Sequence, residues 1–352
     1  MKKKNGIIGE RVKVEDIEFT IETIKNSDSI YSENVGKIQS IEKIDDITFK
    51  IHLVEPVNFF EYSLCFPIMQ EKTYNQGIPG GTGKYKIDKL NEKEIIIKSD
   101  NKTITIKIYN TVAELYNNFT REKVDLIITK NSNYEEYIGN IGFEETIITG
   151  REFYYISCEN IKDTKTRKII ASSISKEKLV YDLFNKRYKI AEFPLDYGNY
   201  LNKENNKKEE LKKSKNMQLT LSMEEFDRNK DIAQIIKEQL KEKNIDIVIQ
   251  YYNNINSDMI LKKQIVPITP EIDIYFTDEE IKQEIIKISN IEDKEVLKKE
   301  YEKIIEKYYE ETPFICLYFN SYIILHNSKL KGDFSGNWYN FFYSIDNWYK
   351  VV

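Results

Sequence analysis

Residues 217–251 read MQLTLSMEEFDRNKDIAQIIKEQLKEKNIDIVIQY, and this stretch decides the fold class. We predict a strand at 217–223, a helix at 230–243 and a second strand at 245–251, with a further strand at 271–277. The helix would turn four aliphatic side chains inward: Ile232, Ile235, Ile236 and Leu240. Consecutive strand-helix-strand units favour a largely parallel sheet covered by helices.

The first part of the chain carries similar units. Carboxylates open residues 15–25 and isoleucines recur there at helical spacing, which predicts a short amphipathic helix. Residues 37–44 and 47–53 alternate around Asp45 and Asp46, which predicts a two-stranded hairpin with one wet face. His52 lies on that wet face. Further along, we predict strands at 94–98, 103–109 and 124–129, with a helix at 112–119 before the last of them.

The last third is helical and then aromatic. Residues 292–310 predict a long charged helix that precedes an aromatic strand at 314–325. The tail at 334–343 is so aromatic that we expect it to pack against the body of the protein. Residues 202–216, rich in Lys, Glu and Asn, are interpreted as a solvated connection, with a basic docking patch as the alternative.

Composition excludes several classes of protein. The 352 residues suit about two domains. The 58 acidic residues outnumber the 53 Lys and Arg, giving a net charge of -5, which disfavours a nucleic-acid binder. No run reaches the ~18–20 apolar residues of a membrane helix. The first residues lack the apolar stretch of a signal peptide, so the chain by itself would remain in the cytoplasm.

Motifs for catalysis or metal binding are weak. The string at 80–85, GGTGKY, lacks the spacing of a phosphate loop and is interpreted as a glycine-dependent turn or hinge. The two histidines, His52 and His326, belong to no metal-binding cluster, and no nucleophile elbow occurs. The three cysteines lie far apart and are interpreted as small core residues. A pair of catalytic carboxylates stays open, but we expect no enzyme, no cofactor and no metal.

Tyrosine-rich strings are the remaining signal, at 153–155, 251–252, 308–309 and 314–322. Tyrosine offers an apolar ring and a hydroxyl group with little rotamer freedom to lose, so these strings suit a cleft that binds varied polar chains. Half-buried core tyrosines are the alternative for each of them.

Several strings, in order along the chain, resemble the family 5 extracellular solute-binding proteins, which serve peptide and nickel ABC importers. Residues 13–20 (KVEDIEFT) resemble the family's Thr-Ala-x-Asp-Val-x-Phe-Ser/Thr helix start, and 41–57 its Asp-Asp-x-Thr-Phe-x-Val-x-Leu strand followed by Pro. Residues 81–87 (GTGKYKI) are similar to its Gly-Thr-Gly-Pro-Tyr segment, with Lys84 in place of Pro. Residues 154–180 and 311–319 (ETPFICLYF) resemble its Val-Arg-x-Ala helix segment and its late Pro-x-x-x-Leu-Tyr strand.

The resemblance implies a two-lobed α/β fold of the periplasmic-binding-protein type (type II), with mixed sheets and a cleft between the lobes. Relative to the family the chain is expected to lack its usual N-terminal segment. Residues 1–80 would be the remnant of a small extra subdomain, residues 81–155 with 323–352 would form lobe I, and residues 156–322 would form lobe II.

The resemblance also implies function. The chain would capture a small polar ligand, most simply an oligopeptide, and deliver it to an ABC transporter permease as a monomer at the cell surface or in the periplasm. Membrane association would come only from the permease or from a lipid anchor on the missing segment. The alternative is a non-transporting interaction or sensory module with the same fold.

Four residues are the expected ligand contacts. Asp278 stands nearest to the family's Trp-x-x-Asp carboxylate, which neutralises a peptide's amino group, although a helix-capping role for Asp278 is equally open. Tyr318, Tyr275 and Tyr31 would complete the ligand shell.

Overall fold

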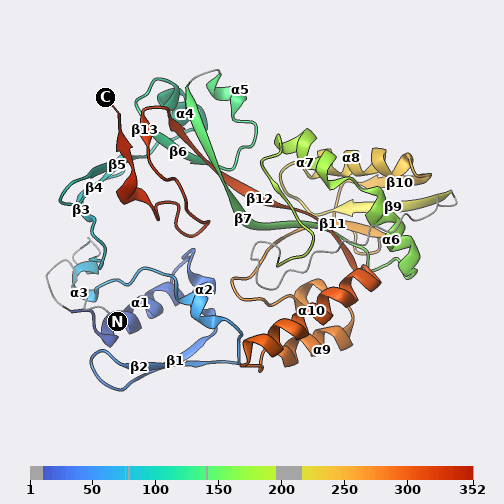
Figure 1. Ribbon diagram of the computed structural model, residues 1–352, viewed down its shortest axis with the longest axis horizontal. Helices are drawn as coiled ribbons and strands as arrows, with labels where there is room; N and C mark the ends of the chain where they lie inside the picture. The colour runs from blue at the N-terminus through green and yellow to red at the C-terminus, as the bar shows by residue number, and fades with distance from the viewer. Residues whose placement is uncertain (1–10, 76, 78–79, 140–141, 196–215, 352) are drawn as a thin grey trace. The chain divides into compact units, whose positions relative to one another are not determined.

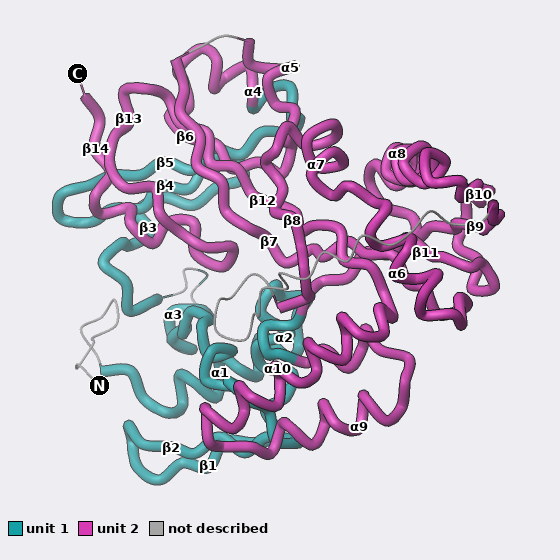
Figure 2. Tube along the Cα trace, turned by 45° about the vertical axis from the view of Figure 1, so that its right-hand side comes forward, with its two compact units in different colours: residues 1–115, 267–270 teal, residues 116–266, 271–352 magenta. Residues whose placement is uncertain are grey.

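The computed structural model of the chain describes residues 11–75, 77, 80–139, 142–195 and 216–351 (Figure 1). The chain divides into two compact units (Figure 2). The first comprises residues 1–115 and 267–270, and the second comprises residues 116–266 and 271–352. These bounds come from contacts within the chain. The predicted lobes rest on the family resemblance, so their boundaries stay a prediction.

The first unit begins with the predicted amphipathic helix, α1 (Val14–Lys25). Asp16 accepts a hydrogen bond from the backbone N–H of Lys13, 3.0 Å away, so the carboxylate caps the first turn. Ile21 and Ile24 are buried against α2 (Ser32–Gly36) and the hairpin of β1 (Ile38–Lys43) and β2 (Phe49–Leu53). The helix and the hairpin are both confirmed.

His52 is exposed on the hairpin, where Nε2 lies 2.9 Å from Oε2 of Glu42, as the wet-face prediction requires. The unit continues through η1 (Phe60–Leu64) and α3 (Glu71–Tyr74) into an antiparallel sheet of β3 (Lys86–Leu90), β4 (Glu94–Lys98) and β5 (Thr103–Lys107). The sequence predicted β4 and β5 but not β3, whose three charged residues mask a short alternation.

The second unit is built on a seven-stranded sheet in the order β10-β9-β11-β7-β12-β6, with β8 (Lys189–Ile190) paired to β12. The strands are β6 (Leu126–Thr129), β7 (Phe143–Ser157), β9 (Met217–Met223), β10 (Ile245–Gln250), β11 (Met259–Ile265) and β12 (Phe314–Asn327). β9, β10 and β11 run parallel, but β7 is antiparallel to both β11 and β12. The sheet is therefore mixed, as the family resemblance implied, and not largely parallel.

The predicted strand at 271–277 is wrong. Those residues contain a single 3₁₀ turn, η2 (Asp273–Tyr275), and the third parallel strand is β11, which the sequence analysis missed. The buried side chains there are Ile272, Tyr275 and Phe276, a helical spacing, whereas a strand would bury every second residue.

Helices cover both faces of this sheet. On one face, α6 (Thr164–Ser173), α7 (Lys176–Phe184) and α8 (Asn229–Lys241) share a hydrophobic core with β7, β9 and β12. On the other face, aromatic rings of β7 and β12 contact the η2 segment and α10 (Lys294–Glu311), which packs beside α9 (Glu279–Ile288). The two helices at α8 and α10 were predicted.

The remaining elements are short. They are α4 (Val112–Thr120), α5 (Glu135–Ile138), β13 (Leu330–Lys331), η3 (Ile345–Asn347) and β14 (Tyr349–Lys350). Phe334 of the tail is buried against β7 and β12, together with Trp348 further along, so the start of the aromatic tail packs as expected. Tyr343 is 74% exposed, so the expectation is wrong for the tip of the tail.

Several smaller expectations concern single features. Cys158 and Cys316 are buried core residues, but Cys65 is exposed, so the core interpretation is wrong for that cysteine. Within the described residues, none of the helices is both long enough and apolar enough to cross a membrane. Nearly all of the predicted connection at 202–216 lies outside the described residues.

Candidate functional site

Asp278 is the N-cap of α9. Its Oδ1 accepts hydrogen bonds from the backbone N–H groups of Glu280 (2.9 Å) and Ile281 (3.1 Å). This is the capping role that the sequence left open, because an aspartate before a helix satisfies donors that have no partner in the first turn. The side chain is exposed, and its role in ligand binding stays a prediction.

The structure does not bring the predicted tyrosines together. Tyr318 is 1% exposed and stacks on Tyr154 with ring centres 4.6 Å apart, on the face of the sheet that α7 covers. Tyr275 is 5% exposed and packs edge-on against Phe153 at 5.4 Å, on the opposite face. Tyr31 belongs to the first unit, where it packs half-buried against the core of α1 and the hairpin.

Charged and aromatic side chains that were not predicted as a site gather around Glu152 of β7. We call Lys130, Glu152, Tyr154 and Tyr322 the Glu152 cluster. The ammonium group of Lys130 lies 2.6 Å from Oε1 of Glu152, and the hydroxyl of Tyr154 donates a hydrogen bond to Oε2 at 3.1 Å. The same ammonium group lies 5.1 Å from the ring centre of Tyr322, within the range of a cation–π contact.

Strand geometry accounts for this grouping. Glu152 and Tyr154 are two residues apart on β7, so their side chains leave the same face. Tyr322 belongs to β12, which pairs with β7, and Lys130 follows the last residue of β6, which pairs with the other edge of β12. Three adjacent strands thus supply the four side chains.

Burial and charge set the protonation of the cluster. Partial burial, the largest influence, opposes ionisation of Glu152, but the hydrogen bond and charge of Lys130 outweigh it and lower the pKa of Glu152. Burial also opposes the charged form of Lys130, but the hydrogen bond and the charge of Glu152 outweigh burial and raise the pKa of Lys130. Burial and the charge of Glu152 raise the pKa of Tyr154, which stays a proton donor. The cluster therefore holds one anion and one cation at neutral pH.

One aromatic ring of the tail contacts the Glu152 cluster, since Phe341 packs edge-on against Tyr322 with ring centres 4.9 Å apart. A second, Trp338, lies 4.5 Å from the guanidinium of the neighbouring Arg151. Charged groups bordered by aromatic rings can bind a charged end and the apolar parts of a short polar chain. The arrangement offers an acceptor for an ammonium group and a donor for a carboxylate, but no general acid–base pair with an activated nucleophile.

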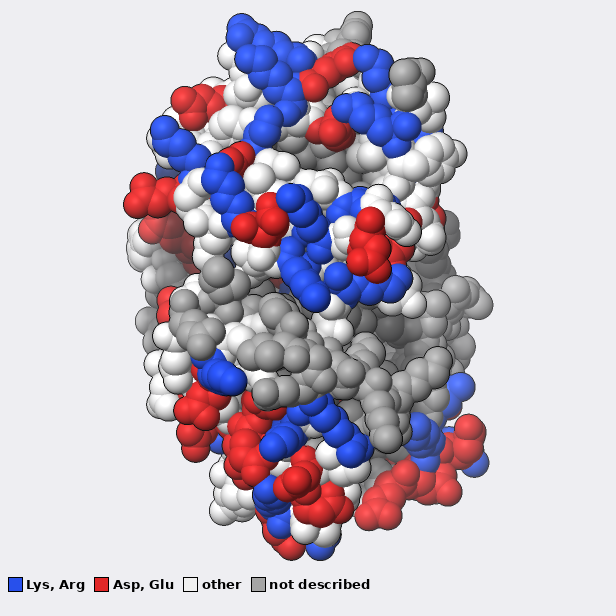
Figure 3. Space-filling view, turned by 90° about the vertical axis from the view of Figure 1, so that its left-hand side faces the viewer, with Lys and Arg blue, Asp and Glu red and all other residues white. Residues whose placement is uncertain are grey.

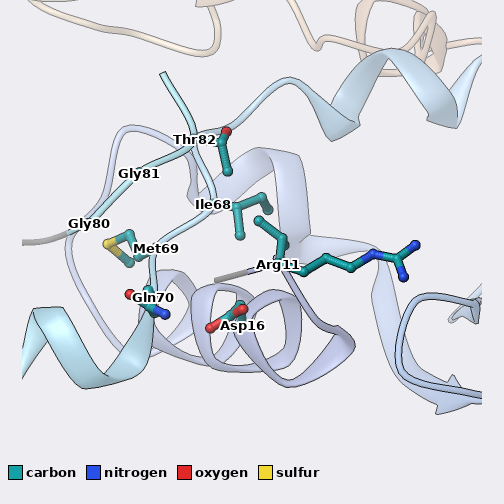
Figure 4. Close-up of a pocket in the computed structure, with 9 residues that line it drawn as sticks. Arg11, Asp16, Ile68, Met69, Gln70, Gly80, Gly81 and Thr82 are labelled. Carbon is teal, nitrogen blue, oxygen red and sulfur yellow. The ribbon is translucent and has the colours of Figure 1, made fainter. Parts of the chain in front are cut away.

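The pocket of the first unit is a weaker candidate (Figure 4). Its empty volume of about 240 Å³ includes open solvent, and very little of that space is enclosed. Figure 4 shows the Arg11 side chain extending away from the other labelled residues. Gly80 lines this pocket, and a Cβ there would lie 2.6 Å from Oγ1 of Thr73. Close packing therefore accounts for glycine at this position, and no phosphate-binding role is needed to explain it.

The face seen in Figure 3 gives no sign of a nucleic-acid site. On the face seen in Figure 3, basic and acidic side chains are interspersed and form no stripe of one sign. Across the part of the chain that the structure describes, no three His, Cys, Asp or Glu side chains gather as metal ligands would.

The missed residues carried only a faint signal. Glu152 directly precedes the string Phe153-Tyr154-Tyr155 within a strand, where a carboxylate needs a partner if its neighbours are buried. Lys130 is 22 residues away, and its pairing with Glu152 follows from the order of the strands. That order could not be read from the sequence.

The family described as "Bacterial extracellular solute-binding proteins, family 5 Middle" matches residues 9–269. No curated protein matches the sequence.

Solved structures with the same fold include three of known source. The oligopeptide-binding protein AppA from Bacillus subtilis, in complex with a nonapeptide, has a TM-score of 0.61 at 17% identity, over 100% of this chain and 86% of its own. NikZ from Campylobacter jejuni, in complex with Ni(L-His), has a TM-score of 0.65 at 18% identity, over 99% and 87%. The ABC transporter substrate binding protein CtaP from Listeria monocytogenes has a TM-score of 0.76 at 14% identity, over 99% and 86%.

These structures establish the two-lobed binding-protein fold that the sequence predicted, and the match over 9–269 establishes the family. The chain belongs to the bacterial extracellular solute-binding proteins of family 5, the substrate-binding components of ABC importers.

Proposed function

We propose that this chain captures a short peptide and delivers it to an ABC transporter permease. The observation that carries the proposal is the Glu152 cluster, in which a carboxylate on β7 is paired with an ammonium group just after β6, in a solute-binding fold. Structural relatives include AppA, solved with a nonapeptide, and NikZ, solved with Ni(L-His), so the family accommodates ligands of different chemistry.

One charged end of a peptide suits the cluster. The ligand's amino group would approach the carboxylate of Glu152 through a charge-assisted hydrogen bond, beside the ion pair with Lys130. The half-buried ring of Tyr322 would contact the ligand's main chain, while the buried Tyr154 holds the carboxylate of Glu152 by its hydrogen bond. Asp278 is proposed as a second contact for the amino group, as the family resemblance implied, and closure of two lobes would bury the ligand.

Further properties belong to the same proposal. Family and fold are those of substrate-binding proteins, which are not enzymes. The family is extracellular, so we propose that the chain works as a monomer at the cell surface or in the periplasm and meets the membrane through the permease.

A specific observation favours the alternative of an interaction module. Residues 250–257 (QYYNNINS) contain no charged side chain, and Tyr251, Tyr252 and Ile255 are between 60% and 76% exposed. The loop is nevertheless fixed, because the Nδ2 of Asn160 donates to the carbonyl oxygens of Ile255 and Ser257, both at 2.7 Å. A rigid loop that displays apolar side chains suits a protein partner.

The test is thermal denaturation with and without a mixture of short peptides. Binding to the folded state stabilises it by RT ln(1 + [L]/Kd), about 2.7 kcal/mol at 100 times Kd. We expect the peptides to raise the transition of the natural chain and to raise it less for Glu152→Gln. Asp278→Asn keeps an N-cap side chain, so a smaller rise in that variant would report ligand contact and not loss of the cap. No rise in a cooperatively unfolding chain would refute peptide capture and favour the interaction module.

A further inference from the structure

β7 and β12 lose their regular pairing next to Glu152. Phe319 pairs with Phe153, and Ser321 pairs with Thr149, so the single residue Asn320 lies opposite the three residues 150–152 of β7. Such a bulge redirects the side chains that it contains. Glu152 is the last residue of the bulge, and its carboxylate is the centre of the Glu152 cluster.

Asn320 fills the bulge from the other strand. Its side chain is fully buried, and Oδ1 accepts a hydrogen bond from the backbone N–H of Glu152 at 2.9 Å. A Cβ on Gly150 would lie 2.2 Å from that Oδ1 and under 3.0 Å from two more atoms of the same side chain. Glycine at position 150 is therefore what allows Asn320 to reach the amide of Glu152.

The bulge is also fixed on its far side. The carbonyl oxygen of Arg151 accepts a hydrogen bond from the N–H of Val266 at 2.8 Å, and Nε of Arg151 donates to the carbonyl oxygen of Val266 at 2.7 Å. These bonds join the bulge to the residue that follows β11. The backbone before Glu152 is held by Val266 and the amide of Glu152 by Asn320.

Asn320 is a poor choice for stability alone. Its Nδ2 is buried and has no hydrogen-bond partner among the described residues, and a buried donor without a partner destabilises the fold. The neighbouring Ser321 is equally buried, and its hydroxyl also has no partner among those residues. An apolar side chain at position 320 would avoid that cost but would supply no acceptor to Glu152.

We infer that Asn320 is a positioning residue for ligand capture, which holds the amide of Glu152 and so aims its carboxylate at Lys130 and at the ligand. The inference rests on the proposed function for its link to the ligand. Its structural part, that Asn320 places the Glu152 carboxylate, stands without any ligand. Loss of the Oδ1 acceptor frees the backbone at Glu152 and loosens the ion pair with Lys130.

The experiment measures the carboxylate of Glu152 directly. The chain is labelled with ¹³C at the glutamate carboxyl carbons, the Glu152 signal is assigned by its loss in Glu152→Gln, and its pKa is followed by NMR without ligand. We expect Asn320→Ala to raise the pKa of Glu152, because burial then acts with a weaker opposing charge. The matched control is Ser321→Ala, which removes a buried oxygen from the same strand and should leave that pKa unchanged.

A second pair of variants keeps the test decisive if Asn320→Ala folds poorly. Gly150→Ala alone drives its Cβ into Asn320, whereas Gly150→Ala combined with Asn320→Ala removes the atoms that collide. We expect the double variant to lose less free energy of unfolding than the two single variants lose together. It should also show the same raised pKa of Glu152. An unchanged pKa of Glu152 in a folded Asn320 variant overturns the inference.

Peptide binding separates the inference from the proposed function. We expect Asn320→Ala to weaken binding of the peptide mixture about tenfold, as Glu152→Gln does, and Ser321→Ala to leave it unchanged. If Glu152→Gln binds peptides as well as the natural chain while Asn320→Ala still shifts the pKa, the positioning role stands and the ligand contact at Glu152 is refuted. If Glu152→Gln weakens binding and Asn320→Ala changes neither pKa nor affinity, the proposed function stands and the positioning role is refuted.

Discussion

Replacing Glu152 by Gln removes one charge from a half-buried pair and makes the stability of the protein less dependent on pH. The Glu152 side chain is 22% exposed and receives hydrogen bonds from Lys130 and Tyr154. A hydrogen bond to a charged group contributes about 1.5–3 kcal/mol, but the Lys130 side chain is 47% exposed, so solvent screens much of the pair. We expect Glu152→Gln to lower the free energy of unfolding by about 1–2 kcal/mol at pH 7.

The sign of the pH dependence follows from the lowered pKa of Glu152. A carboxyl group whose pKa is lower in the folded state stabilises the fold above its unfolded pKa, near 4.3 for glutamate. That stabilisation is lost as the pH falls through the folded pKa. The difference between the natural chain and Glu152→Gln should therefore shrink as the pH falls below about 4.

The assay is urea denaturation of both proteins at pH 7 and at a series of lower pH values. Glu225→Gln is the control, since Glu225 is exposed and forms no hydrogen bond or ion pair with any described residue. Its stability should match that of the natural chain throughout. The free energy of unfolding of Glu152→Gln could instead be lower than that of the natural chain by the same amount at every pH. That result would refute the claim that the charge of Glu152, and not its size, stabilises the fold.

Three further changes test other parts of the account. Asp278→Ala should cost about 1 kcal/mol by removing the cap of α9, and Asp278→Asn only a few tenths, measured by denaturation; equal costs would contradict the capping role. Gly80→Ala should destabilise by roughly 1–3 kcal/mol, because its Cβ would meet Thr73, and Gly81→Ala, with no atom within 4 Å, should be tolerated; the reverse order would show that the turn is placed wrongly. Ile232→Ala should cost about 2–5 kcal/mol, since this residue is fully buried in the core under the sheet, and a loss below 1 kcal/mol would mean that α8 does not pack as described.

Regular patterns in the sequence predicted the three longest helices, α1, α8 and α10, and more than half of the described strands, but not β7. The spacing of Ile232, Ile236 and Leu240 fits a helix and not a strand, and the alternation in the hairpin fits strands and not a helix. Both elements formed as predicted. β11 was missed because its sequence, MILKKQI, has a buried half and a charged half, which matches neither an alternating nor a fully buried strand. The strand expected at 271–277 failed because aromatic and β-branched residues there serve a 3₁₀ turn.

The candidate site was harder to predict than the fold. Asp278 was chosen from the resemblance to the family's Trp-x-x-Asp carboxylate, and the structure shows the helix cap that was its open alternative. The Glu152 cluster depends on the order of β6, β12 and β7 in the sheet, which brings Lys130 to Glu152. Asn320 acts through an irregular register, and no single-residue pattern in the sequence distinguishes a bulge from a regular strand.

The central claim is that the chain binds short peptides through the Glu152 cluster. Native mass spectrometry of the purified chain, mixed with short peptides of defined masses, tests it most directly. The account predicts one peptide bound per chain, with occupancy reduced about tenfold in Glu152→Gln and unchanged in Glu225→Gln. A folded natural chain that retains no peptide, or a Glu152→Gln variant that retains as much as the natural chain, would contradict it.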